Sequence, residues 1–172
     1  MARSRRPTVY LDANFLSALH FHGNNPFLMA RQRASRDWWK WERNYFQILA
    51  SNFVERELRS GSYPGQQEAT AEVQRLCYLP FTQQVRALVG TYLQRGLVPE
   101  SAAGDAIHLA FATCHRVDYL LTWNYAHLAN LEVARRLKEL NDQWNLRSPF
   151  LVTPENIPRK SLGQDPRRTD ES

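Results

Sequence analysis

Five acidic or amide side chains lie directly after predicted strands or within predicted helices, where folding could bring them together. They are Asp12, Glu55, Glu57, Asp105 and Asn124. Carboxylates gathered at one edge of a sheet repel one another, and their pKa values rise unless a cation lies among them. Hard divalent ions such as Mg²⁺ and Mn²⁺ prefer this all-oxygen arrangement and retain several waters. The pattern therefore predicts a site for a divalent cation.

Each of these residues also has an ordinary structural explanation when it is taken alone. An aspartate after a strand, such as Asp12, often caps the following helix. Glu55 and Glu57 suit a solvated helix face, and Asp105 near a helix start is favoured by the helix dipole. What favours a shared site is the joint pattern, in which these residues follow one another in order along the chain and each lies on the appropriate strand end or helix.

Short apolar segments alternate with longer helical ones, which indicates an α/β fold with a mainly parallel sheet. Strands are expected at 8–11, 46–50, 79–81, 118–123 and 149–153, and helices at 13–19, 27–45, 52–60, 66–76, 82–93, 99–117 and 131–144. In such sheets, sites form beyond the carboxyl ends of the strands. Asp12 and Asn124, which follow two of these strands, are therefore the first positions to consider.

Four segments resemble the successive motifs of PIN domains, namely residues 10–14, 51–61, 104–110 and 119–124. The resemblance extends over residues 7–158 and is closest to the VapC-type toxins of bacterial type II toxin–antitoxin pairs. It implies a three-layer α/β/α fold with a short, mainly parallel central sheet. It also implies a cytoplasmic, Mg²⁺- or Mn²⁺-dependent endoribonuclease that cleaves RNA, binds a cognate antitoxin and forms a homodimer.

The resemblance also assigns roles to individual residues. Asp12 and Asp105 would hold the ion as catalytic acids, and the second family acid falls on Glu57, four residues before Gly61. Glu57 would bind the ion directly or through water, or orient the nucleophile. Glu55 remains a rival for this position.

Asn124 departs from the family pattern, because many PIN domains carry an aspartate there. An asparagine offers a carbonyl oxygen to a metal or its water but brings no negative charge. The change therefore weakens the case for two metal ions more than the case for one. Asp118, at the opposite end of the same strand, is poorly placed to substitute. Asn14 could position a phosphate or a metal-bound water, although a plain helix-start role is the slightly favoured interpretation.

Residues 31–43 combine five basic side chains with three tryptophans, a composition that suits RNA because bases stack on aromatic rings and phosphates pair with cations. The predicted RNA contacts are Arg31, Arg33, Arg36 and Lys40. The favoured alternative is that at least two of the tryptophans pack on the core. A protein interface is a third interpretation.

The net charge of +5 is distributed unevenly along the 172 residues. The basic N-terminal tail 1–6 and the polar tail 159–172, which is expected to be disordered, together carry +4, whereas the single domain at 7–158 carries +1. A uniformly basic nucleic-acid-binding face therefore does not follow from the charge. Two cysteines exclude a disulfide framework and a four-thiolate zinc site, and they fit a reducing cytosol. The chain has no apolar run of about 18 residues, so a membrane span is not expected.

Two other functions are compatible with the same residues. The domain could be a non-catalytic PIN-like module that binds RNA or protein, since Asn124 removes one charge from the site. A nuclease directed at DNA is also compatible, because the sequence does not distinguish RNA from DNA.

Overall fold

Five parallel strands form one central sheet in the computed structural model, which describes residues 5–160. The strands are β1 (Thr8–Leu11), β2 (Gln47–Ala50), β3 (Cys77–Tyr78), β4 (Tyr119–Leu121) and β5 (Phe150–Val152). Their order in the sheet is β3-β2-β1-β4-β5, and every neighbouring pair is parallel. The expected α/β fold is confirmed, and the sheet is parallel throughout.

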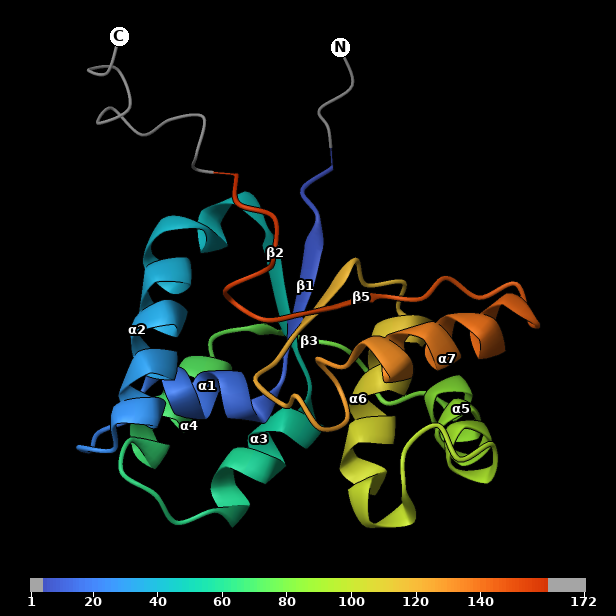
Figure 1. Cartoon of the computed structure of the whole chain (residues 1–172), viewed down its shortest axis with the longest axis horizontal. Coiled ribbons are helices and arrows are strands. Elements are labelled where there is room, and N and C mark those ends of the chain that lie inside the picture. Colours follow the sequence, from blue (N-terminus) through green and yellow to red (C-terminus); the bar gives the residue numbers. More distant parts are fainter. Residues whose placement is uncertain (1–4, 161–172) are drawn as a thin grey trace, which may run out of the picture.

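Within residues 5–160, seven α-helices surround the sheet: α1 (Ala13–Leu19), α2 (Pro26–Trp41), α3 (Asn52–Ser60), α4 (Gln66–Val73), α5 (Gln83–Gln94), α6 (Ala103–Cys114) and α7 (Leu131–Asp142). Helices α1, α2 and α4 lie on one side of the strands, and α5, α6 and α7 lie on the other (Figure 1). Right-handed crossovers produce this division, because the chain moves from β1 to β3 in one direction and then to β4 and β5 in the other. The result is the expected three-layer α/β/α arrangement.

The reversal of strand order lies between β1 and β4, which are neighbours in the centre of the sheet. Leu11 pairs with Leu121, so the residues that follow these two strands, Asp12 and Thr122, emerge side by side. Ligand sites in open parallel sheets form at such a reversal, beyond the carboxyl ends of the strands. The reversal of strand order therefore lies where the sequence predicts a site, at the carboxyl ends of β1 and β4.

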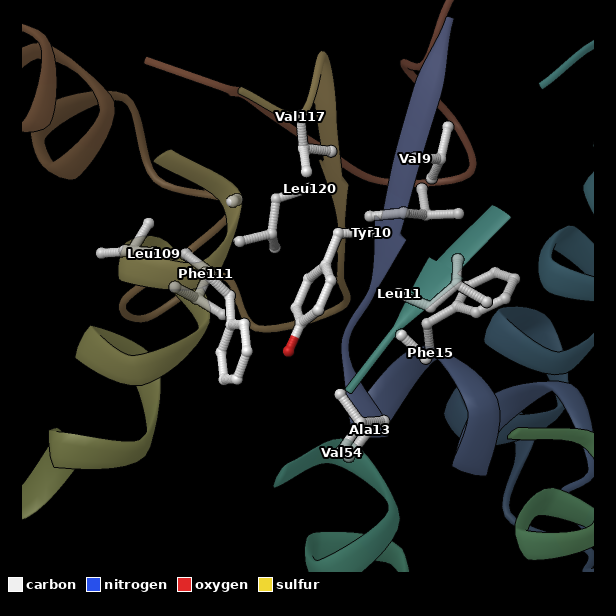
Figure 2. Close-up of a cluster of buried hydrophobic side chains, with 14 of the residues drawn as sticks. Val9, Tyr10, Leu11, Ala13, Phe15, Val54, Leu109, Phe111, Val117 and Leu120 are labelled. Atoms are coloured by element: carbon white, nitrogen blue, oxygen red, sulfur yellow. The ribbon is translucent and has the colours of Figure 1, made fainter. Parts of the chain in front are cut away.

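The core is built on both faces of β1, because successive side chains of a strand point to opposite sides. Tyr10 extends toward Phe111 of α6, whereas Leu11 extends to the face where Phe15 of α1 lies (Figure 2). All four of these side chains are buried. The Tyr10 hydroxyl points toward the carboxyl end of the strand, which brings a polar atom from the core to the edge of the site.

Several predicted boundaries differ from the observed ones. The helix expected at 99–117 is instead a 3₁₀ turn, Glu100–Ala102, followed by α6, which ends at Cys114. Pro99 has extended backbone angles, and Arg116 has a φ of 52°, so neither end can continue the helix. The helix expected at 27–45 ends at Trp41 and the one at 66–76 ends at Val73. The strand expected at 79–81 lies at Cys77–Tyr78.

The tryptophans of α2 bear out the packing interpretation of residues 31–43. Trp38 is fully buried against Phe15 and Phe46, and Trp39 packs on the core while partly exposed. Trp41 is 52% exposed. Two of the three indoles therefore serve the core.

The chain termini fall partly outside the described residues. Residues 1–4 of the predicted basic tail and residues 161–172 of the predicted disordered tail lie there. Within residues 5–160, no helix has the length and apolar character needed to cross a membrane.

Candidate functional site

Asp12 lies at the carboxyl end of β1 and is both a helix cap and a buried acid. Its Oδ1 accepts a hydrogen bond from the Asn14 backbone N–H at 3.4 Å, which caps α1. Its Oδ2 accepts a hydrogen bond of 2.6 Å from the hydroxyl of Thr122, which follows β4. The side chain is 6% exposed. The capping interpretation is therefore correct, and it fixes the carboxylate at the edge of the sheet.

The two glutamates of α3 point to different surroundings. Glu55 accepts hydrogen bonds from Arg59 at 2.8 and 2.9 Å and from the Tyr78 hydroxyl at 2.9 Å. Glu57, two residues on, has its Oε2 2.7 Å from Nε2 of His108 on α6. Of the two rivals, Glu57 therefore approaches Asp12 and Glu55 is held in a separate network.

His108 joins the two carboxylates, a role that the sequence did not predict. Its Nε2 faces Glu57 Oε2 at 2.7 Å and Asp12 Oδ1 at 3.3 Å, and the side chain is 1% exposed. One ligand atom each from Asp12, Glu57 and His108 lies within 4.8 Å of the other two. We call these three residues the acid–histidine group. Asp105, three residues before His108 on α6, does not bond to the imidazole, because both ring nitrogens face other residues.

A second layer of hydrogen bonds fixes the orientation of the His108 ring. The hydroxyl of Tyr10 lies 3.2 Å from His108 Nδ1 and 2.7 Å from Ser51 Oγ. Ser51 also caps α3 by accepting from the Val54 backbone N–H. Tyr10 and Ser51 were not singled out from the sequence, because they look like a strand residue and a helix cap. They hold the imidazole with Nε2 directed at the carboxylates.

Burial and neighbouring charges shift the pKa values of Asp12 and His108. Burial raises the pKa of Asp12, the nearby charge of His108 and the Thr122 hydrogen bond lower it, and the carboxylates of Glu57 and Asp105 raise it again, with a net upward shift. For His108, burial would lower the pKa, but the charges of Asp12 and Glu57 outweigh it and raise the pKa. The buried carboxylate of Asp12, with the partly exposed carboxylate of Glu57 beside it, thus favours a positive partner, whether a proton or a metal ion.

Asp105 lies beside the acid–histidine group and is bound to the loop after β4. Its Oδ1 accepts from the Asn124 side-chain amide at 3.0 Å, and its Oδ2 is 2.8 Å from His127 Nδ1. The carbonyl oxygen of Asn124 accepts from the His127 backbone N–H at 3.1 Å. Both ends of the Asn124 amide are therefore engaged in holding the loop. His127 was missed because it lies in a loop without a motif of its own.

Asn14 connects the start of α1 to the end of β4. Its Oδ1 accepts from the Trp123 backbone N–H at 2.8 Å and lies 3.2 Å from the Thr122 hydroxyl. A structural role at the start of the helix, the favoured interpretation, therefore includes positioning the loop that holds Asp105. Asp118 lies at the other end of β4 and binds Thr8 and Arg147, as its position in the strand predicted.

The predicted RNA-binding side chains have different contacts along α2. Arg31 lies 4.4 Å from the ring centroid of Phe27 and 5.5 Å from that of Tyr125, so it borders the loop after β4. Arg36 donates to the backbone oxygen of Leu19. Lys40, nine residues beyond Arg31 on α2, lies over the ring of Trp41. Arg33 is exposed on the same helix. Of the four side chains, Arg31 has contacts that connect it to the loop beside Asp105.

Comparison of the chain with models of protein families, with curated proteins and with solved structures gave no match.

Proposed function

We propose that this chain is an Mg²⁺- or Mn²⁺-dependent endoribonuclease that hydrolyses RNA phosphodiester bonds. The observation that carries the proposal is the approach of Asp12 and Glu57 to a common point at the reversal of strand order. A buried carboxylate beside a second, partly exposed one is unfavourable without a positive partner. A divalent ion would satisfy them and would bind phosphate as well.

The donor set fits one divalent ion. Asp12 and Glu57 supply carboxylate oxygens, the ligands that Mg²⁺ and Mn²⁺ prefer, and such ions keep waters in their remaining positions. The imidazole nitrogen of His108 suits softer ions better, so its principal role is to hold the two acids together. Asp105 would complete the charge of the site, directly or through water. When bound, the ion would activate a water and stabilise negative charge on the phosphate.

The residues of the chain would position these groups before substrate binds. The Thr122 hydroxyl fixes one oxygen of Asp12, and His108 fixes one oxygen of Glu57. Because these contacts hold the carboxylate oxygens in place before binding, little reorganisation is needed, and such preorganisation is the main source of electrostatic catalysis. Arg31, on the border of the site, would attract the RNA backbone.

The biological part of the proposal rests on the resemblance to VapC-type toxins. The protein would act in the cytoplasm, form a homodimer and be restrained by a cognate antitoxin. Expression in a bacterial host should arrest growth, and the Asp12→Asn variant should not. Growth arrest by both proteins alike would contradict the toxin assignment.

Cleavage of RNA by the purified protein tests the activity. We expect cleavage with Mg²⁺ or Mn²⁺, none with EDTA, and none by the Asp12→Asn, Asp105→Asn double variant. Asp142→Asn is the matched control, because Asp142 is an exposed aspartate paired with Lys138 on α7. Cleavage by the double variant at the control's rate would overturn the proposal.

A non-catalytic binding module is the second candidate, and the position of His108 favours it. Its imidazole already lies between Asp12 and Glu57, so it could take the place of the metal ion. Calorimetric titration with Mn²⁺ separates the two functions. Binding that is lost in Asp12→Asn supports the nuclease, whereas no heat of binding at millimolar Mn²⁺ supports the module.

A further inference from the structure

An apolar cavity of about 390 Å³ lies between α3, α6 and the segment that follows β3. Its apolar walls are the side chains of Phe53, Leu79, Phe81, Ile107 and Phe111. Phe81 is 53% exposed, so one aromatic ring stands open at the edge of the cavity. Concave sites of this size with a mainly apolar and aromatic lining are typical of small-molecule pockets.

The cavity shares a wall with the acid–histidine group. The ring of Phe53 lies edge-on to the imidazole of His108, with their centroids 5.1 Å apart. Phe53 and Glu57 are four residues apart on α3, which places them on the same face of that helix. Gly104 on α6 allows the close approach, because a Cβ there would lie 3.2 Å from Glu57 Oε1 and 3.6 Å from Phe53 Cζ. A ligand in the cavity would therefore lie beside the proposed catalytic acids.

The polar groups around the cavity are an amide and cations. Asn52 and Arg56, both exposed on α3, are the polar side chains in its lining, and no carboxylate belongs to that lining. The guanidinium of Arg86 lies 5.7 Å from the ring centroid of Phe81. This combination suits a planar ring attached to an anionic backbone, because rings stack on aromatic side chains and phosphates pair with arginine.

We propose that this cavity binds one unpaired nucleobase of the RNA, next to the phosphate presented to Asp12 and Glu57. The inference deepens the proposed function and rests on it for the identity of the nucleic acid. The base would stack against Phe81, Asn52 would offer hydrogen bonds to the base edge, and Arg56 would pair with a neighbouring phosphate. Such a pocket requires the RNA to be single-stranded where it enters, because a base-paired nucleotide cannot leave its stack without a cost.

Binding of two ligands in EDTA tests the proposal without cleavage. The ligands are a short single-stranded RNA and an abasic ribose-phosphate chain of the same length, both followed by fluorescence anisotropy. We expect the wild-type protein to prefer the RNA, and Phe81→Ala to reduce that preference by about fivefold or more. Phe81→Trp, which keeps an aromatic face, should retain it. Arg56→Ala should weaken both ligands equally, because it removes a phosphate contact.

Phe150→Ala is the matched control, because Phe150 on β5 is 63% exposed and is not part of the cavity lining. Its preference for RNA should equal that of the wild-type protein. The proposal is overturned if Phe81→Ala keeps the full preference. It is also overturned if Phe81→Ala leaves RNA binding unchanged but converts a dimer to a monomer in sedimentation, since the cavity would then be a protein interface.

The binding experiment and the cleavage assay together separate this inference from the proposed activity. A preference for RNA that depends on Phe81, found in a protein that cleaves nothing with Mg²⁺ or Mn²⁺, would support the cavity and contradict the nuclease. Metal-dependent cleavage by a protein whose preference for RNA does not depend on Phe81 would support the nuclease and contradict the proposed base-binding cavity.

Discussion

His108 is held by residues that are distant from it in the sequence. Tyr10 lies 98 residues before it and Glu57 lies 51 residues before it, yet both contact its ring. The position of the imidazole therefore depends on the correct packing of β1, α3 and α6 against one another. This is why a side chain that looks like part of an apolar helix face lies at the centre of the site.

Asp118 gives a prediction about stability at the residue scale. Partial burial would raise its pKa, but hydrogen bonds from Thr8 and Arg147 outweigh this and lower the pKa below its ordinary value of 3.8. A carboxyl whose pKa is lowered by folding stabilises the protein above its unfolded pKa, and this stabilisation is lost as the pH falls through the folded pKa. Between about pH 5 and about pH 2 the wild-type protein should therefore lose more stability than Asp118→Asn.

Urea unfolding at a series of pH values measures this difference. At pH 7, Asp118→Asn should lower the free energy of unfolding by about 1–2 kcal/mol, because hydrogen bonds to a charged group are lost. The two stability curves should converge in acid. Parallel curves throughout the acid range would show that Asp118 is not stabilised in its charged form.

At the scale of elements, the ends of helices were harder to predict than their existence. The expected bounds 13–19 and 52–60 are those of α1 and α3, since Asp12, Ser51 and Gly61 are clear boundary residues. The bounds of α6 were wrong because Ala102 and Arg116 leave helical geometry in response to their surroundings. No side-chain preference of either residue signals this.

Two helix glycines give a paired prediction about elements. Gly90 lies within α5 with no atom within 4 Å of an added Cβ, so Gly90→Ala should stabilise the protein by about 0.5–1 kcal/mol and leave activity unchanged. Gly104→Ala should instead displace the Glu57 carboxylate, whose Oε1 would lie 3.2 Å from the new Cβ. We expect cleavage to fall with little change in melting temperature.

Thermal unfolding and RNA cleavage of the two variants, measured together, provide the check. A Gly104→Ala protein with wild-type activity would mean that the close packing of α6 on Glu57 has no part in the site. A fall in activity for Gly90→Ala would remove its value as a control.

At the scale of the whole molecule, the positive charge at the two ends of the described chain lies away from the candidate site (Figure 1). Residues 1–4 contribute +1 and residues 161–172 contribute −1, so residues 5–160 carry the full +5. Arg5 and Arg6 precede β1, and Lys160 is anchored where its backbone N–H donates to the buried Glu42. Both ends of the described chain leave the sheet on the side away from α3 (Figure 1). The net charge therefore does not surround the acids.

A chain shortened to residues 5–160 should retain the rate of RNA cleavage and its dependence on salt to within about twofold, because the net charge is unchanged. Cleavage rates of the full and shortened chains over a range of salt concentrations measure this. A markedly smaller salt dependence for the shortened chain would mean that the terminal residues contact the RNA.

The parallel sheet and the position of Asp12 at its carboxyl edge could be predicted from the sequence. The side-chain contacts made by the candidate acids could not. Asp12 could be predicted because an acid directly after a buried strand must emerge at the carboxyl edge. Position on the helix alone could not show which of Glu55 and Glu57 joins the candidate site. The choice depends on how α3 packs against α4 and α6. Tyr10, His108 and His127 depend on pairings between distant segments, which local patterns do not specify.

The most direct test of the central claim compares RNA cleavage by Glu57→Gln and Glu55→Gln, in Mn²⁺ and in EDTA. The two substitutions are chemically identical and lie on the same helix, but Glu57 contacts His108 while Glu55 contacts Arg59 and Tyr78. We predict that Glu57→Gln lowers cleavage in Mn²⁺ by about 100-fold or more, that Glu55→Gln cleaves like the wild-type protein, and that none cleaves in EDTA. Equal activity of the two variants, or cleavage by the wild-type protein in EDTA, would contradict the claim.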